Sequence, residues 1–352
     1  MEIIKLTKDK YKEWDEFCLA SDDAWFWHTT GWLEYNLNYR TDLNPQSFSF
    51  FGIDNGQIIA ACSLILEDYD GRKEFSFGAI PNMVPVFANN LLDTTKKKAM
   101  KAVFKEIDRL AKEHNVKKAS FRFPVLNKSY LEGNMPQNNY LVQFGYLDTS
   151  INTQVNVLKE KTKKLSYQAD RNIKKSLKIL KIEIFDRNNI NREIFNKYTE
   201  LHHKAAERIT RPSFTFNIMY DWIKEGDAFL VGAMKGDEYF GFSYFYLYKN
   251  NVYYGSGCND PEFIESPVAH LIHYKAMGWM KKNRYKFYEI GWQNDFSSLS
   301  NCPTLKDVNI SRFKHDFGGY TVPLFMGEKY YDKNYFLKVY QERINKYADL
   351  IE

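Results

Sequence analysis

The first half of the chain alternates between short apolar runs and turn residues in a pattern that predicts a three-stranded meander, a helix and a closing strand. The turns DNGQ and DGRK separate the first three runs, and Asn-Gly and Asp-Gly favour hairpins because they tolerate positive φ. Apolar residues at helical spacing follow over 93–115, with Asp93 at the expected N-cap. The four strands are expected at 47–53, 58–69, 74–81 and 117–124.

The second half of the chain repeats this order. Its helix is expected over 266–282, with Ser266 as the N-cap and Pro267 at the first helical position. Corresponding elements keep nearly the same offset along the chain, so the pattern indicates a tandem duplication of one α/β unit. The strands of the second unit are expected at 228–234, 238–248, 252–258 and 286–292.

Composition agrees with a folded protein of two domains. The 352 residues exceed one ordinary domain, and 44% hydrophobic with 17% aromatic residues supply apolar surface for two cores. The longest apolar runs are about half the length that a membrane helix needs. Charges also occupy the N-terminus, where a signal peptide needs an apolar segment. We therefore expect a cytoplasmic protein with no membrane partner.

Cysteine spacing and charge narrow the ligand classes. The four cysteines show no CxxC spacing, so neither a structural zinc site nor a disulfide is expected. The net charge of +5 suits an anionic small-molecule ligand, and ordinary solubilising charge explains it equally well. The basic segment 160–184 is either a solvated helix that joins the domains or a positive rim beside an anionic ligand.

The order of elements resembles the GNAT acyltransferase fold, and two such units in tandem resemble the FemABX-like acyltransferases. That group builds peptidoglycan bridges from aminoacyl-tRNA, and its relatives N-acylate nucleotide-linked amino sugars. The resemblance covers nearly the whole chain. YQADRNIKKSLK stands where the family often shows an Arg-x-x-Ile-x-Lys pattern, and ISRFKHDFGG is similar to its Phe-Lys…Phe-Gly-Gly signature.

The resemblance implies two tandem GNAT-like α/β domains with mixed sheets and a ligand cleft between them. The N-terminal domain is expected over 1–150 and the C-terminal domain, with the acyl-donor site, over 151–330. A terminal amphipathic helix, 331–352, is expected to pack on the first domain. No metal is implied, and the protein is expected to be a monomer or a homodimer.

The implied activity is transfer of an acyl group from acyl-CoA to the amino group of a nucleotide-linked, dTDP-type amino-deoxy sugar, as in lipopolysaccharide biosynthesis. The amine attacks the thioester directly, without a covalent enzyme intermediate. The alternative is an aminoacyl-tRNA-dependent transferase that extends a peptidoglycan precursor, and only this alternative brings tRNA in as a partner. A catalytically inactive ligand-binding scaffold is a third reading.

The sequence also departs from the family at two places. Several peptidoglycan-directed members carry a lysine four residues after a tryptophan, where this chain has Asn36 after Trp32. The loop 259–265 lacks the glycine-rich phosphate cradle of simple GNAT enzymes. A coenzyme A pyrophosphate would therefore need the N-terminus of the Ser266 helix and nearby basic side chains.

Acyl transfer to an amine needs a positioned carbonyl, a neutral amine and stabilisation of the oxyanion. Tyr254, Asn259 and Asp260 come at the end of the strand 252–258. Asp260 is either a proton acceptor or a turn residue beside Pro261.

The stretch NISRF, 309–313, alternates like a strand. Such a strand would pack Phe313 in the core and place Lys314 on the opposite face, toward the cleft. The alternative is a surface lysine paired with Asp316 or Asp307.

Further residues are candidates for substrate contacts, each with a structural alternative. Arg208 and Arg211 match phosphate or carboxylate with paired donors, or simply place charge at a helix C-terminus. His202 and His203 must face different ways on a helix. Core or loop roles compete for the remaining candidates. The substrate or donor contacts expected are Phe313, Ser266, His270, His203, Arg208, Arg211, Trp292, Asn294, Trp32, Tyr35 and Asn36.

Overall fold

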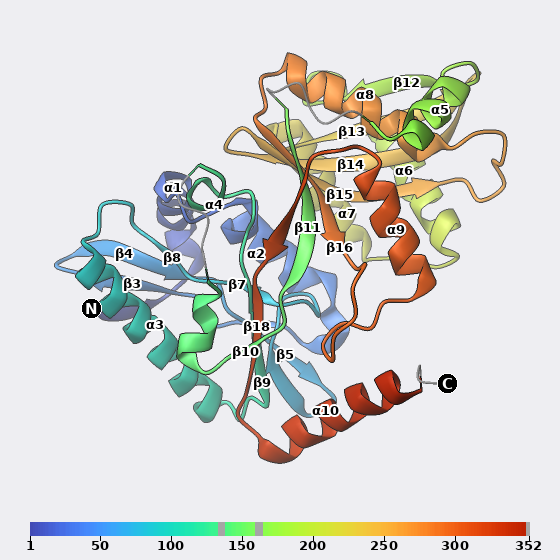
Figure 1. Cartoon of the computed structure of the whole chain (residues 1–352). Helices are drawn as coiled ribbons and strands as arrows, with labels where there is room; N and C mark the ends of the chain where they lie inside the picture. Colours follow the sequence, from blue (N-terminus) through green and yellow to red (C-terminus); the bar gives the residue numbers. More distant parts are fainter. Residues whose placement is uncertain (133–137, 159–164, 350–352) are drawn as a thin grey trace. The chain divides into compact units, whose positions relative to one another are not determined.

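The computed structural model describes residues 1–132, 138–158 and 165–349 of the chain (Figure 1). The first part of the predicted basic segment, 160–164, lies outside these residues. The chain forms two compact units. Unit 1 comprises Met1–Ile151, Asn294–Leu305 and Pro323–Glu352, and unit 2 comprises Asn152–Gln293 and Lys306–Val322.

Unit 2 is built on a seven-stranded mixed sheet with the order β12-β13-β14-β15-β16-β11-β17. Strands β12 to β15 form an antiparallel meander, and β16 pairs parallel to β15 and antiparallel to β11. The strands are β11 (Ile151–Val157), β12 (Lys181–Phe185), β13 (Ala228–Lys235), β14 (Glu238–Tyr248), β15 (Asn251–Asn259), β16 (Phe287–Gln293) and β17 (Tyr320–Leu324).

Helices cover both faces of this sheet (Figure 1). Leu271 and Ala276 of α8 share one apolar core with Phe229 and Phe245 of the sheet. On the other face, the ring of Tyr198 in α6 contacts Phe242 and Tyr244. Successive strand residues thus point to α8 or to α6 in turn. The helices of unit 2 are α5 (Tyr167–Ser176), α6 (Arg192–Ala206), α7 (Ser213–Glu225), α8 (Val268–Lys282) and α9 (Leu305–His315).

Unit 1 contains a four-stranded sheet, β1-β3-β4-β8, and a seven-stranded sheet, β10-β18-β9-β6-β5-β2, in which β7 also pairs with β9. Its strands are β1 (Glu2–Lys5), β2 (Gln46–Ser47), β3 (Phe50–Asp54), β4 (Gln57–Cys62), β5 (Ile65–Tyr69), β6 (Arg72–Phe75), β7 (Asn82–Met83), β8 (Val86–Phe87), β9 (Lys118–Arg122), β10 (Leu147–Asp148) and β18 (Met326–Tyr330). Its helices are α1 (Tyr11–Ala20), α2 (Thr30–Tyr39), α3 (Asp93–Glu113), α4 (Lys128–Leu131) and α10 (Lys333–Ala348), with 3-10 turns at Lys8–Lys10, Phe26–His28, Thr41–Leu43 and Tyr140–Phe144.

The apolar face of α3 forms the core of unit 1 with β4, β6 and β9. Val103, Phe104 and Ile107 of α3 lie in one buried cluster with Phe75 and Phe121. Each unit therefore has a parallel pair of strands joined through a helix, β6–α3–β9 in unit 1 and β15–α8–β16 in unit 2. The strand–helix–strand order expected at the end of each repeat is confirmed.

The prediction of one strand over 58–69 is wrong. The segment forms β4 and β5, which belong to different sheets. The chain changes sheets at Ser63 and Leu64, where the backbone N–H of Leu64 donates to Ser49 Oγ at 3.1 Å. An uninterrupted apolar run fits both descriptions, because hydrophobicity alone does not mark a change of sheet.

The prediction of a strand over 309–313 is also wrong, since these residues lie in α9. The ring of Phe313 contacts Phe317 and His270, a pattern of packing that a helix and the turn after it provide. Gly318 and Gly319 follow with φ of 74° and 83°, and β17 begins only after them. The glycine pair ends a helix here.

Candidate functional site

The parallel strands β15 and β16 of unit 2 pair over only three residues. Their register runs from Asn251 opposite Phe287 to Tyr253 opposite Glu289. Beyond this point β15 continues to Asn259 and β16 to Gln293, and the described residues show no further pairing between the two strands. The sheet therefore opens between β15 and β16 immediately after Tyr253 and Glu289.

A bulge on each strand explains why the pair separates there. Gly255 is an extra residue on β15 relative to β14, and Ile290 is an extra residue on β16 relative to β11. Bulges bend a strand and increase its local twist. Gly291 follows the second bulge with φ of 111°, a conformation that side chains disfavour. Gly255 and Gly291 are therefore the sequence features that accompany the separation of the two strands.

Lys314 reaches the opening from α9. Its Nζ donates a hydrogen bond to the backbone carbonyl of Trp292 at 2.6 Å, at the far end of β16. A Cβ placed on Gly291 would lie 3.4 Å from Lys314 Nζ and 3.9 Å from the Tyr253 hydroxyl. The ammonium and the phenol therefore approach the same point of β16, and the missing side chain of Gly291 leaves room for both.

The electrostatic surroundings of Lys314 make it a weaker base than an ordinary lysine. Burial lowers the pKa of Lys314 to about 8, and the carboxylate of Glu289 opposes this shift. Glu289 is itself buried and accepts a hydrogen bond from Thr153 Oγ1 at 2.7 Å. We call Tyr253, Glu289, Gly291, the Trp292 carbonyl and Lys314 the Lys314 cluster. The surface ion pair considered for Lys314 does not describe this position.

Tyr254, expected at the site, points to the other face of the sheet. Its ring lies 4.5 Å from that of His273 in α8, and burial raises the pKa of its hydroxyl to about 12. His273 is fully buried, shares a 2.6 Å hydrogen bond with Tyr288, and has its pKa lowered to about 3 by burial. Tyr253 faces Lys314 instead. The sequence gives two adjacent tyrosines, and only the pairing with Glu289 identifies which one faces the cluster.

The first turn of α8, expected to bind phosphate, packs against α5. Ser176 Oγ of α5 donates to the carbonyl of Pro267 at 3.0 Å. The N-cap of α8 is Pro267 and not Ser266, so the predicted N-cap is wrong by one residue. The Ser266 hydroxyl is buried and has no hydrogen-bond partner among the described residues. α5 thus covers the helix end that a pyrophosphate would use.

His270 belongs to a polar network on the same side. Its Nε2 lies 3.3 Å from Asp316 Oδ2 and 3.5 Å from Asn172 Nδ2. Asp316 also accepts from the hydroxyl of Ser166 at 2.6 Å. Burial lowers the pKa of His270, and Asp316 opposes the shift. These contacts connect α5, α8 and the turn after α9, which gives His270 a structural role in this arrangement.

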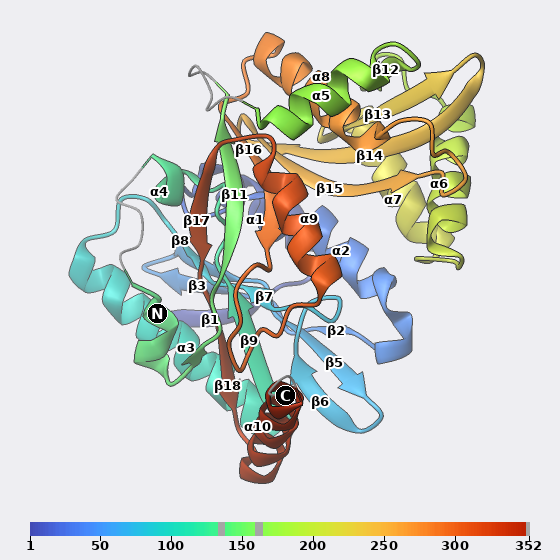
Figure 2. The ribbon, with the colours of Figure 1, turned by 45° about the vertical axis from the view of Figure 1, so that its right-hand side comes forward.

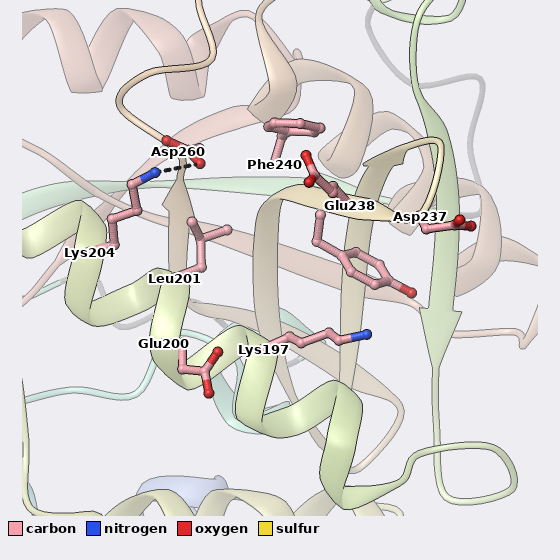
Figure 3. Close-up of a pocket in the computed structure, with 9 residues that line it drawn as sticks. Lys197, Glu200, Leu201, Lys204, Asp237, Glu238, Phe240 and Asp260 are labelled. Carbon is pink, nitrogen blue, oxygen red and sulfur yellow. Dashed lines mark hydrogen bonds and ion pairs between the residues drawn. The ribbon is translucent and has the colours of Figure 1, made fainter.

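Asp260 and Asn259 lie apart from the Lys314 cluster. Asp260 is seven residues beyond Tyr253, roughly 23 Å along an extended strand. It forms an ion pair with Lys204 at 3.0 Å and lines a cavity of about 530 Å³ with Leu201 and Phe240 (Figure 3). Four acidic and two basic side chains are among the residues that line that cavity. The structure does not bring Asp260 to the point where the strands separate.

The candidates after α6 form a separate group. Arg211 Nη1 donates to Met219 Sδ at 3.1 Å and its guanidinium lies 5.2 Å from the Phe216 ring. Arg208 is exposed. His203 Nδ1 accepts from the backbone N–H of Thr210 at 3.3 Å. His203 lies in the last turn of α6, and Arg208 and Arg211 lie on the loop between α6 and α7, where Arg211 packs on α7 and Arg208 is exposed.

The remaining candidates, apart from Trp292, belong to unit 1. Trp32 and Tyr35 stack with ring centroids 5.0 Å apart, and Asn36 Nδ2 donates to the Trp32 carbonyl at 2.8 Å. All three are buried. Asn294 begins a segment that is grouped with unit 1. Trp292 contributes its backbone carbonyl to the Lys314 cluster.

Two classes of feature are absent from the part of the chain that the structure describes. No group of three or more His, Cys, Asp or Glu residues there has the arrangement of a metal site. Among the described helices, none combines the length and apolar character that crossing a bilayer requires.

Comparison with known proteins assigns the fold. Neither a family model nor a curated protein matches the sequence. Among solved structures, the chain is similar to FemX at 12% identity and a TM-score of 0.64, covering 97% of this chain and 100% of that one. L-PGS from Bacillus licheniformis matches at 11% identity and 0.60, covering 97% of both chains. A tandem GNAT protein from the clavulanic acid pathway matches at 10% and 0.52, covering 94% and 98%. The chain thus has a tandem-GNAT, FemX-like α/β fold.

Proposed function

We propose that the protein is an N-acyltransferase whose chemistry takes place at the Lys314 cluster of unit 2. One observation carries this proposal: the side chain of Lys314, half-buried, reaches the region where two parallel strands have separated. Separated strands leave a slot for an extended acyl donor, and Lys314 reaches this slot from α9. The tandem-GNAT fold supports the same reaction class by analogy.

In this reaction the neutral amine of the acceptor attacks the donor carbonyl. A C–N bond forms, the C–S bond of a thioester breaks, and the amine proton passes to solvent or to the departing thiolate. No covalent enzyme intermediate is needed. The Lys314 ammonium donates to the carbonyl oxygen as negative charge develops on it, a contact worth about 3–4 kcal/mol in a dry site.

For the donor we propose acyl-CoA, and for the acceptor a nucleotide-linked amino sugar of the dTDP type. Because α5 covers the first turn of α8, the donor pyrophosphate would use side-chain cations instead of that helix end. Arg171, Lys175 and Lys178 on and after α5 are exposed and supply such charge. Arg208, exposed after α6, is the proposed contact for an acceptor phosphate.

The covered end of α8 also favours a second candidate. An aminoacyl ester carried by tRNA needs no pyrophosphate cradle, and the basic face of α5 suits a nucleic-acid backbone. Under this alternative, a tRNA-dependent transferase acts on a peptidoglycan precursor. The Lys314 cluster would perform the same step on an oxygen ester.

Donor competition separates the two candidates. The purified protein would be incubated with a dTDP-linked amino-deoxy sugar and either acetyl-CoA or aminoacyl-tRNA, and products identified by mass spectrometry. We expect the sugar to gain an acetyl group only with acetyl-CoA, and coenzyme A to raise the melting temperature more than deacylated tRNA does. Transfer from aminoacyl-tRNA to a peptidoglycan precursor, with none from acetyl-CoA, would reverse the ranking.

A further inference from the structure

A second cavity, of about 350 Å³, lies in unit 1 on the face of β6 and β9 that points away from α3. Phe75 and Phe121 of these strands face the α3 core, whereas Glu74 and Ser120 line the cavity. Tyr335 of α10 also lines it, and Figure 2 shows α10 beside β18. The cavity plays no part in the reaction proposed for unit 2.

Two cations are fixed at this cavity. Arg72 Nε and Lys118 Nζ each lie 3.0 Å from a carboxylate oxygen of Glu74, whose side chain is only 5% exposed. The Arg72 guanidinium carbon also lies 4.9 Å from the centroid of the Tyr69 ring and 5.2 Å from that of Tyr335. Ion pairing and the two rings therefore hold Arg72 in place before any ligand arrives.

The carboxylates around the cavity are already supplied with donors from the protein. Glu74 accepts from Tyr335 Oη at 2.7 Å in addition to its two cations. Glu328 accepts from Arg343 and Tyr330, each at 2.9 Å. Arg72 and Lys118 have more unused N–H groups than Glu74 and Glu328 have unused acceptor positions. The cavity therefore has a surplus of hydrogen-bond donors.

Two hydroxyls strengthen this conclusion. Ser120 of β9 and Thr149 line the cavity, and each residue is only 6% exposed. Neither hydroxyl makes a hydrogen bond to another described residue. Neither hydroxyl oxygen is among the polar atoms fully shielded from solvent, so both are open to water or to a molecule bound in the cavity.

We propose that this cavity binds a small polyhydroxylated anion, either a sugar phosphate or a sugar acid. The negative group would lie against Arg72 and Lys118, and the neighbouring hydroxyls against Ser120 and Thr149. Pro81 and Met326 provide an apolar wall for the C–H face of a sugar ring. The proposal is independent of the activity of unit 2.

Calorimetric titration of the full chain tests this site with glucose 6-phosphate, glucuronate, inorganic phosphate and glucose as probes. At least one anionic sugar should bind, with phosphate and glucose each about tenfold weaker or more. Arg72→Gln should weaken the anionic sugar about tenfold to a hundredfold, because charge-assisted hydrogen bonds are lost. Ser120→Ala should weaken it less. Lys98→Gln, which removes an exposed cation of α3, should leave binding unchanged.

Each outcome bears on the proposal. Absence of binding by both anionic sugars overturns it, as does equal binding by Arg72→Gln and the wild type. If glucose binds as tightly as the anionic sugars, Arg72 and Lys118 do not recognise a negative group and the proposal of an anionic ligand is wrong. If inorganic phosphate binds as tightly as glucose 6-phosphate, the sugar ring contributes nothing to binding and the proposal of a sugar ligand is wrong. Arg72→Lys, which keeps the charge, should retain part of the affinity and confirms that the loss does not come from unfolding.

Discussion

At the scale of single residues, the position of Lys314 rests on its neighbours more than on its own helix. The Trp292 carbonyl fixes its ammonium, and the glycine at 291 leaves the space beside it open. Phe313 and Lys314 were expected from the sequence to be functional, but their geometry was assigned to a strand. The side chains of adjacent residues point in different directions on a helix as well as on a strand. Phe313 and Lys314 therefore still point in different directions, although they lie in a helix and not in the predicted strand.

Replacing Lys314 by alanine should remove the oxyanion contact and keep the fold. We expect kcat/KM to fall at least about a hundredfold, the size of one such contact. The melting temperature should stay near that of the wild type, since the lysine is costly to bury. Lys306→Ala, an exposed lysine at the start of the same helix, is the matched control and should be fully active. Normal turnover in folded Lys314→Ala would remove Lys314 from the mechanism.

The lowered pKa of Lys314 should also appear in stability against pH. Its pKa of about 8 in the folded chain lies below the ordinary value of 10.5, so between these values the unfolded state binds more protons. Stability of the wild type should therefore rise between pH 8 and 10.5 relative to Lys314→Met. Urea titrations at several pH values measure this difference. If the difference in the free energy of unfolding between the wild type and Lys314→Met stays constant over this pH range, Lys314 has the pKa of an ordinary lysine.

At the scale of elements, periodicity predicts the order of strands and helices, because each element needs one apolar face. It does not predict the break between β4 and β5, since both pieces are apolar and the change of sheet is a tertiary event. Nor does it predict the bulges at Gly255 and Ile290, which open the sheet. The sequence analysis named Tyr254, whereas Tyr253 faces the cluster, because the pairing of Tyr253 with Glu289 sets which side chain points there and periodicity does not give that register.

Gly291 allows a direct test of the opening. Gly291→Ala must hold an alanine at φ of 111° and place a Cβ 3.4 Å from Lys314 Nζ. We expect a loss of about 1–3 kcal/mol in the free energy of unfolding and a further loss of kcat. Gly278→Ala in α8 is the control, since nothing lies within 4 Å of its Cβ position and alanine favours a helix. An active and undiminished Gly291→Ala protein would contradict the geometry of the cluster.

At the scale of the whole molecule, the two units share a strand–helix–strand motif but differ in the charged groups beside their parallel strands. Unit 2 has an opening between its parallel strands with a lysine inside it, whereas unit 1 has a cavity rich in charge beside its own parallel pair. The sequence predicted that the α/β unit is repeated, but it did not predict that the two units differ in these charged groups. It contains no signal that Arg72, Lys118 and Tyr335 meet, because they lie in three distant segments and converge only after folding.

The terminal helix α10 should stabilise unit 1 selectively. It attaches there through Asp332 to Lys117 at 2.6 Å, Tyr335 to Glu74 and Arg343 to Glu328, although none of its described residues is fully buried. Deleting 333–352 leaves Glu74 and Glu328 with fewer donors, and each loss costs about 1–3 kcal/mol. Hydrogen exchange should therefore accelerate in β9 and β18, which lie beside α10, and remain slow in β13 and β14 of unit 2. Equal acceleration in both sets of strands would mean that α10 supports the whole chain and not unit 1 alone.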